Sequence, residues 1–197
     1  ARLGVDSVAQ SFEWIRELLG PERLVGSLDH NVRIPTALGA LRPTALYQPS
    51  MEDGIPVGQE FLIVGFNRLK DFYPALAAEN LRLQKDVNGN PISARSAYVD
   101  LDVRGEELDT TGTIFARALD LKENRVRLVE LLKQIVRPGE TVGLPAVLGL
   151  NDPTAWKDIQ EMLGHPVFEI MLQPPSVPGM RLNHELTEIA KANCRVM

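Results

Sequence analysis

Short apolar runs along this chain alternate with segments in which apolar residues recur at helical spacing. We expect strands at residues 61–65, 95–102, 141–144 and 167–172. The first run is apolar throughout, as is typical of a strand covered on both faces. Regular alternation of strands and helices predicts an α/β fold, in which a mostly parallel sheet of about four strands carries helices on both faces.

The helices expected between these strands have recognisable start and stop residues. They cover residues 71–83, 111–136 in two pieces, 152–164 and 180–192. Asp71 can cap the first of them, and the second breaks near Asp120. Asp152 precedes Pro153, which is the favoured order at a helix start, and Gly164 is a typical helix stop.

An N-terminal helix and a β-hairpin are expected before the first strand of the sheet. Ser7 followed by Gln10 fits a capping box, and the helix that it would start ends at Gly20. Residues 32–48 are rich in β-branched residues on either side of Gly39, which predicts two short strands around a turn.

Residues 49–58 contain two prolines and two glycines and are interpreted as a linker. The expected organisation is a helix and β-hairpin over residues 1–50 and an α/β domain over residues 59–197. The chain begins with Ala1 rather than methionine, and residues 194–197 read like the opening of a further strand. We therefore expect the chain to be the interior part of a longer protein.

Composition narrows the functional classes. The 197 residues carry a formal net charge of −5 without a basic stripe, which argues against nucleic acid as a partner. No apolar run approaches the roughly 18 residues needed to span a bilayer, and no signal peptide is visible. The single cysteine, Cys194, excludes an internal disulfide and a cysteine-built metal site. We expect a reducing, cytoplasmic setting.

The motifs of self-contained enzymes are missing from the sequence. No G-x-G-x-x-G follows a strand, so the dinucleotide fingerprint is absent. Neither the G-x-x-x-x-G-K-[ST] phosphate loop nor G-x-S-x-G occurs. The three histidines, His30, His165 and His184, are far apart and do not have the spacing of metal ligands. The sequence therefore supports neither a self-contained hydrolase or kinase nor a metal site.

A proline-rich segment, residues 173–182, lies where a strand leads into a helix. In open α/β sheets ligands bind at the carboxyl ends of strands, and a helix N-terminus suits an anion. Arg181 in the first helical turn is unfavourable with the helix dipole unless an anion is near. One interpretation places Ser176 and Arg181 against a phosphate or a flavin; the other is a rigid connector with a solvated arginine.

A second candidate segment is PTALGALRPTAL, residues 35–46. Arg42 and Thr44 alternate with apolar neighbours on an expected strand, so both would point to one face, and an arginine can bind a phosphate or carboxylate with two hydrogen bonds. The alternative is an edge strand with a polar face. Residues 144–150, LPAVLGL, place small residues at a strand end, either beside a ligand or for tight packing.

Four stretches occur together in a fixed order: PTALGALRPTAL, FLIVGFNRLKDF at residues 61–72, LPAVLGL and PPSVPGMRL at residues 174–182. This series resembles the B subunit of the anaerobic glycerol-3-phosphate dehydrogenase over nearly the whole chain from Leu3 onward. The proline-rich stretch is the most diagnostic element, and the hairpin stretch is the second.

The resemblance implies a flavoprotein that carries FMN or FAD and pairs with the catalytic A subunit of the same complex. A membrane-associated C subunit with iron–sulfur clusters would pass electrons to quinone, and the complex would oxidise glycerol 3-phosphate to dihydroxyacetone phosphate. The protein would be cytoplasmic and peripheral at the inner membrane. Its motif positions include Arg42, Thr44, Ser176 and Arg181, which would lie near the flavin or the substrate.

The glycine-rich fingerprint of such flavoproteins would precede this chain, so the resemblance implies an interior, cap-side domain that alone binds no flavin and is inactive. Two other functions stay open. The chain could be a free-standing α/β domain that binds a small phosphorylated metabolite, or an interaction domain that docks another protein of the complex.

Overall fold

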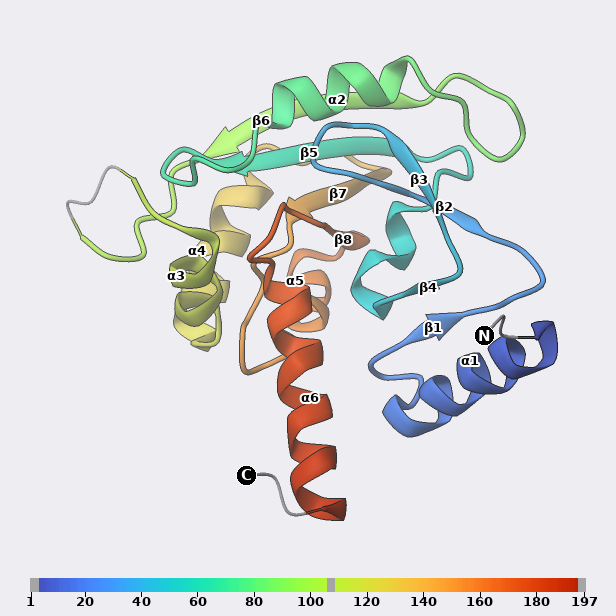
Figure 1. Cartoon of the computed structure of the whole chain (residues 1–197). Coiled ribbons are helices and arrows are strands. Elements are labelled where there is room, and N and C mark those ends of the chain that lie inside the picture. The colour runs from blue at the N-terminus through green and yellow to red at the C-terminus, as the bar shows by residue number, and fades with distance from the viewer. Residues whose placement is uncertain (1–3, 106–108, 195–197) are drawn as a thin grey trace.

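The computed structural model describes residues 4–105 and 109–194. Its helices are α1 (Val5–Leu19), the 3-10 helix η1 (Pro49–Gly54), α2 (Pro74–Arg82), α3 (Gly112–Leu119), α4 (Lys122–Lys133), α5 (Ala155–Leu163) and α6 (Val177–Asn193). Its strands are β1 (Val25–Gly26), β2 (Val32–Pro35), β3 (Leu41–Thr44), β4 (Leu46–Tyr47), β5 (Glu60–Phe66), β6 (Ser93–Val99), β7 (Glu140–Pro145) and β8 (Val167–Ile170). Figure 1 shows their arrangement.

The centre of the molecule is a four-stranded parallel sheet in the order β6-β5-β7-β8. Val64 of β5 lies opposite Ala97 of β6, and Val142 of β7 lies opposite Val167 of β8. Helix α2 covers one face, whereas α3, α4 and α5 lie on the other side (Figure 1). The expected α/β fold with a parallel sheet and helices on both faces is therefore confirmed.

Aromatic rings on β5, β8 and α3 fix the core. The rings of Phe61 and Phe168 meet edge to face with centroids 5.3 Å apart, and those of Phe66 and Phe115 stack at 4.7 Å. A Cβ atom on Gly143 would come within 2.6 Å of the Phe168 ring. This position of β7 therefore requires glycine, because the ring occupies the space of a side chain.

The N-terminal helix and the β-hairpin are present. Strands β2 and β3 pair antiparallel around the turn at Gly39, whose φ of 77° is a conformation that favours glycine. Two further strands of two residues each, β1 and β4, pair beside the hairpin. The segment expected to be a linker contains η1, whose Met51 is buried and whose Gly54 lies against the ring of Phe168. The division into two domains stays a prediction.

Two expected helix caps are wrong. Helix α1 begins at Val5 after Gly4, so Ser7 lies inside the first turn, and its carbonyl accepts a hydrogen bond from the Ser11 hydroxyl at 2.8 Å. Helix α2 begins at Pro74 rather than after Asp71. The residues that precede these helices, Gly4 and Tyr73, have extended backbones and make no side-chain capping hydrogen bond. Neither predicted capping residue therefore caps its helix.

Other boundaries shift by a few residues. Strand β6 starts at Ser93 and ends at Val99, earlier than expected at both ends. Helix α5 starts at Ala155, because the Asp152 carboxylate accepts the backbone N–H of Thr154 in a turn before the helix. Helix α6 starts three residues before the expected Met180. The strand expected to open at residues 194–197 lies outside the described residues except for Cys194, which is the C-cap of α6.

Strands β6 and β7, which flank β5, are joined by an ion pair between Arg95 and the buried Glu140. Arg95 donates to the Glu140 carboxylate at 2.6 Å and to the Ile135 carbonyl at 2.7 Å, and the Arg137 backbone N–H donates to the same carboxylate at 2.8 Å. Burial alone raises the pKa of Glu140, but these hydrogen bonds outweigh it and hold the pKa below the ordinary 4.5.

Because the folded pKa is depressed, Glu140 contributes stability that is present above pH 4.5 and is lost as the pH falls through the folded value. We expect the free energy of unfolding, measured by urea titration at a series of pH values, to decline in that window. Glu140→Gln should flatten this part of the profile. An equally steep acid decline in the variant would contradict this role.

No helix among the described residues is long and apolar enough to cross a membrane. Within the same residues no group of histidine, cysteine, aspartate or glutamate side chains is arranged to hold a metal ion.

Candidate functional site at the carboxyl end of the sheet

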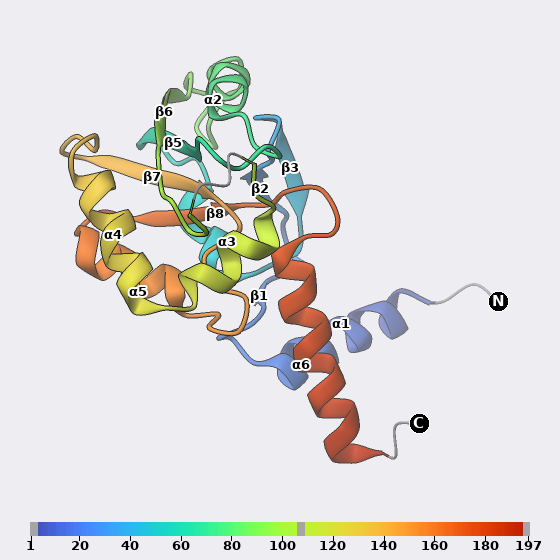
Figure 2. The same cartoon turned by 90° about the vertical axis from the view of Figure 1, so that its left-hand side faces the viewer.

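The three segments singled out in the sequence converge beside the ends of β7 and β8. The amide of Gln48, at the end of the hairpin segment, donates to the Pro178 carbonyl at 3.0 Å. Arg181 of α6 donates to the Gly149 carbonyl, in the loop after β7, at 2.6 Å. The loop between β8 and α6 runs beside the hairpin of β2 and β3 (Figure 2). Folding therefore assembles these segments at the edge where open sheets bind ligands.

Arg181 is buried and its guanidinium is fully engaged within the protein. It forms a two-point ion pair with Glu169 of β8 at 2.6 and 3.0 Å and donates to the carbonyls of Leu148 and Gly149. Burial by itself lowers the pKa of Arg181, but the adjacent Glu169 carboxylate raises it above its ordinary value. Arg181 therefore stays charged and holds α6 to the loop after β7.

The loop after β7 is held from its other side by Asp120, which lies between α3 and α4. One carboxylate oxygen of Asp120 accepts the backbone N–H groups of Leu150, Asn151 and Asp152 at 2.8 to 3.0 Å. The loop reaches this shape through Gly149, whose φ is 90° and whose added Cβ would collide with the Asp152 carbonyl oxygen. Such converging N–H groups form an anion-binding concavity, and here the protein's own carboxylate fills it.

We expect Asp120→Ala to cost about 2–4 kcal/mol of unfolding free energy, because it removes the partner of three backbone N–H groups in a half-buried loop. Urea denaturation would measure the loss. Asp120→Asn, which keeps one acceptor oxygen, should cost less. Equal stability of the alanine variant and the unaltered chain would contradict this account of the loop.

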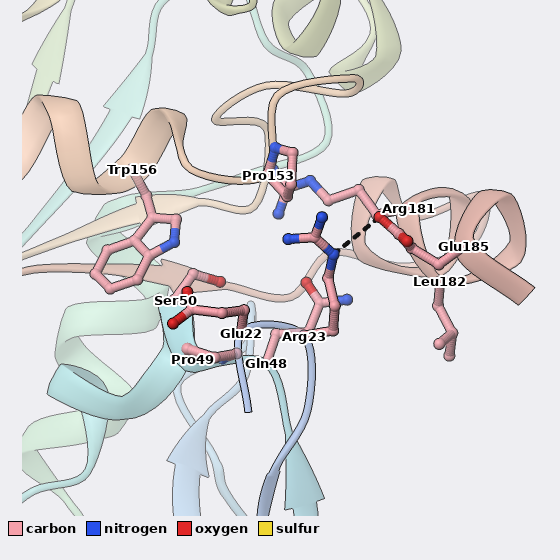
Figure 3. A pocket seen from close by; sticks show the side chains of 10 residues that line it. All are labelled: Glu22, Arg23, Gln48, Pro49, Ser50, Pro153, Trp156, Arg181, Leu182 and Glu185. Atoms are coloured by element: carbon pink, nitrogen blue, oxygen red, sulfur yellow. Dashed lines mark hydrogen bonds and ion pairs between the residues drawn. The ribbon is translucent and has the colours of Figure 1, made fainter. Parts of the chain in front are cut away.

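A small pocket lies between η1 and the first turns of α6 (Figure 3). Its volume is about 30 Å³, which is space for only a few water molecules. Arg23 and Glu185 form an ion pair at 2.8 Å at its edge, and Trp156 and Arg181 form part of its lining. Ser50 also lines the pocket, and its buried hydroxyl has no hydrogen-bond partner among the described residues. A water bound in the pocket would satisfy this hydroxyl.

The four predicted site residues lie on two elements: Arg42 and Thr44 on β3, and Ser176 and Arg181 at the start of α6. Arg42 is exposed on β3, and its side chain makes no hydrogen bond or ion pair within the described residues. Thr44, two residues along the same strand, is half-buried and donates its hydroxyl to the Leu46 carbonyl at 2.8 Å. Ser176 caps α6 by accepting the Gly179 N–H at 3.3 Å. Ser176 and Arg181 are thus committed to local structure, and Arg42 alone of the four has a free polar group.

Two residues of this edge were missed in the sequence, Glu169 and Asp120. Glu169 is the single charged residue in the apolar strand β8, and a charge inside such a strand signals a buried partner. Asp120 was identified only as the break between two helices. Its hydrogen bonds cross 30 to 32 residues of sequence, and no local pattern shows a partner at that distance.

Neither of two pockets among the described residues is suited to a whole flavin. Small-molecule sites usually offer roughly 300–1,000 Å³ of mostly apolar space, and the pocket beside α6 is far smaller. An open groove beside α1 has a volume of about 440 Å³, but Glu13 and Glu17 line it, and its Arg16 is already paired with Glu13. A flavin phosphate would meet two carboxylates there. The concavity at the loop after β7, the best anion site, is filled by Asp120.

Comparison with known proteins gives one family and a consistent set of relatives. The model of the FAD binding domain family matches residues 1–195. The probable anaerobic glycerol-3-phosphate dehydrogenase B subunit of Halobacterium salinarum is 31% identical over 93% of this chain and 44% of its own length.

The anaerobic glycerol-3-phosphate dehydrogenase B subunit of Pectobacterium carotovorum is 31% identical over 95% of this chain and 46% of its own length. The B subunit of Mannheimia succiniciproducens is 30% identical over 93% of this chain and 44% of its own length. The chain thus spans somewhat under half the length of these relatives. No solved structure gives a significant match.

Proposed function

Since this chain belongs to the FAD binding domain family, we propose that it is the interior, cap-side domain of the flavoprotein B subunit of an anaerobic, quinone-linked glycerol-3-phosphate dehydrogenase. The observation that carries the proposal is the similarity to proteins of that name over nearly the whole chain. The parent enzyme would oxidise glycerol 3-phosphate to dihydroxyacetone phosphate.

We propose that the flavin, FAD or FMN, is held by the part of the parent protein outside this chain. The poor fit of a flavin to the two pockets supports this division. The 197 residues alone are then expected to be inactive, and the role of this domain is to cover the flavin and contribute side chains to the substrate side.

Among the four predicted residues, Arg42 is the one we assign to a phosphorylated substrate, with Thr44 beside it on the same strand. An exposed guanidinium that has no partner among the described residues is suited to a phosphate, which it can bind with two parallel hydrogen bonds. Ser176 and Arg181 lie at the same edge of the sheet. They hold the start of α6 and the loop after β7 in the arrangement that faces the flavin.

The proposed partners are the catalytic A subunit and the membrane-associated iron–sulfur C subunit of the same complex. The designation of the relatives as B subunits supports a complex of several chains. The iron–sulfur protein would pass the electrons to quinone, and the complex would then be cytoplasmic and peripheral at the inner membrane. The net charge of −5 is consistent with a domain that does not bind nucleic acid.

A second candidate function is a free-standing domain that binds a small phosphorylated metabolite, which the unpaired Arg42 favours. Calorimetric titration of the 197-residue chain with glycerol 3-phosphate separates the two functions. The cap-domain proposal predicts weak or undetectable binding, because half of the site is supplied by the rest of the parent. Binding at micromolar concentration that is lost in Arg42→Ala would overturn it in favour of the second function.

A further inference from the structure

Helix α1 is a 15-residue helix whose first half has little tertiary support, whereas Ile15, Leu18 and Leu19 in its second half are half-buried. Phe12 is its only buried residue, and on the side that Phe12 shares, Val5 is 86% exposed. Trp14 points away from that side and is 61% exposed. Isolated helices of about 12–15 residues are marginal in water, so the exposed first half of α1 would gain stability from a further partner.

Helix α6 shows the same imbalance beyond its first turns. Its buried residues are confined to Val177, Pro178 and Arg181. Leu182 and Leu186, which continue one face of the helix, are each more than a third exposed. The remaining two thirds of a 17-residue helix therefore project from the body of the molecule, as Figures 1 and 2 show.

The two helices approach one another where Arg23, just past the end of α1, pairs with Glu185 of α6 at 2.8 Å. The described residues begin at Gly4, directly before α1, and end at Cys194, directly after α6. We name the exposed apolar residues that continue one face of each helix, Val5 and Val8 on α1 and Leu182 and Leu186 on α6, the α1–α6 surface.

We propose that the α1–α6 surface docks onto the flavin-binding part of the parent polypeptide, an inference that rests on the proposed function. The relatives are more than twice as long as the segment that they share with this chain. In relatives of this length, the polypeptide outside the shared segment is the partner available to cover the exposed apolar residues of α1 and α6.

The charges around the surface specify the chemistry of the partner. Arg16 is paired with Glu13, and Lys191 is paired with Glu188. No ion pair is found for the carboxylate of Glu17 within the described residues. The docked face of the flavin-binding part is therefore expected to have an apolar centre and basic side chains at its rim.

Hydrogen exchange of the full polypeptide encoded by the gene, compared with the 197-residue chain, tests this docking. We expect amides of α1 and of the distal half of α6 to exchange about 100-fold more slowly in the full polypeptide, because burial of several large apolar side chains suppresses local opening. Amides of β5 should be equally protected in both.

Substitutions sharpen the test. Val8→Asp should reduce the added protection in the full polypeptide at least about tenfold. It should leave the melting temperature of the 197-residue chain nearly unchanged, since Val8 is 50% exposed there. Leu83→Asp is the matched control, because Leu83 is 80% exposed at the end of α2, away from this surface. It should leave the protection intact.

Three outcomes would overturn the inference: equal exchange in both proteins, protection that appears only when another protein of the complex is added, or a dimer of the 197-residue chain that Val8→Asp dissociates. Flavin content and glycerol 3-phosphate oxidation, measured on the same full-length sample, separate this inference from the proposed function. If α1 and α6 are protected but the protein contains no flavin, the proposed docking holds and the proposed function is refuted. If the protein is an active flavoprotein but these helices are unprotected, the proposed function holds and the docking is refuted.

Discussion

Replacing Glu169 by alanine should destabilise the chain by about 3–5 kcal/mol, since it leaves the buried guanidinium of Arg181 without its counter-charge. The side chain of Glu169 is fully buried and that of Arg181 is 6% exposed, so water cannot replace the lost carboxylate. For a domain of this size the melting temperature should fall by roughly 10 °C or more. Thermal and urea unfolding would both measure the effect.

Two further variants identify the cause of that loss. Glu188→Ala removes the acid of a solvent-exposed ion pair with Lys191 on the same helix as Arg181, and it should change stability little. The double variant Glu169→Leu/Arg181→Met removes both charges and should be more stable than Glu169→Ala alone, because an apolar pair carries no desolvation cost. A Glu169→Ala variant within about 1 kcal/mol of the unaltered chain would contradict the account.

Arg42→Ala in the full-length parent should lower kcat/KM for glycerol 3-phosphate about 10- to 100-fold. A hydrogen-bonded charge pair is worth about 1.5–3 kcal/mol, and each 1.4 kcal/mol corresponds to about tenfold in rate. Because Arg42 is exposed and without an internal partner among the described residues, the melting temperature should not change. Arg42→Lys should recover part of the loss, since lysine keeps the charge but not the two-point geometry.

The control for this variant is Arg33→Ala. Arg33 lies on β2 of the same hairpin, opposite Pro43, on the face away from Arg42, and its guanidinium donates to the Lys85 carbonyl at 3.4 Å. Its removal should leave kcat/KM unchanged. Equal losses from both variants would indicate a general effect of charge on the hairpin and would remove Arg42 from the substrate side.

The sequence was sufficient for the elements whose signal is local. Strand β5 is a continuous apolar run, Gly164 ends α5 in the left-handed conformation at φ 74°, and the break between α3 and α4 falls at Asp120. Strands of two residues, such as β1, are too short to show the alternation of apolar and polar residues by which a strand is predicted. Segment 49–58 has the proline and glycine content of a connection, yet Met51 buries its side chain there.

The candidate site was predictable only in outline. Topology places the ends of β7 and β8 at one edge, and the proline-rich segment was correctly located there. The environment of Arg181 was not predictable, because its partner Glu169 lies on a strand 12 residues earlier and on a different element. One interpretation made from sequence placed Arg181 against a phosphate or a flavin, and the other made it a solvated side chain. The structure shows its guanidinium buried against Glu169, and its role toward a ligand stays a prediction.

The most direct test of the proposed function is anaerobic titration of the purified full-length polypeptide, together with its catalytic partner, with glycerol 3-phosphate. The account predicts that the polypeptide contains one flavin and that the flavin absorption band bleaches on addition of glycerol 3-phosphate, but not of glycerol. A polypeptide purified without flavin, or a flavin that glycerol 3-phosphate leaves oxidised, would contradict it.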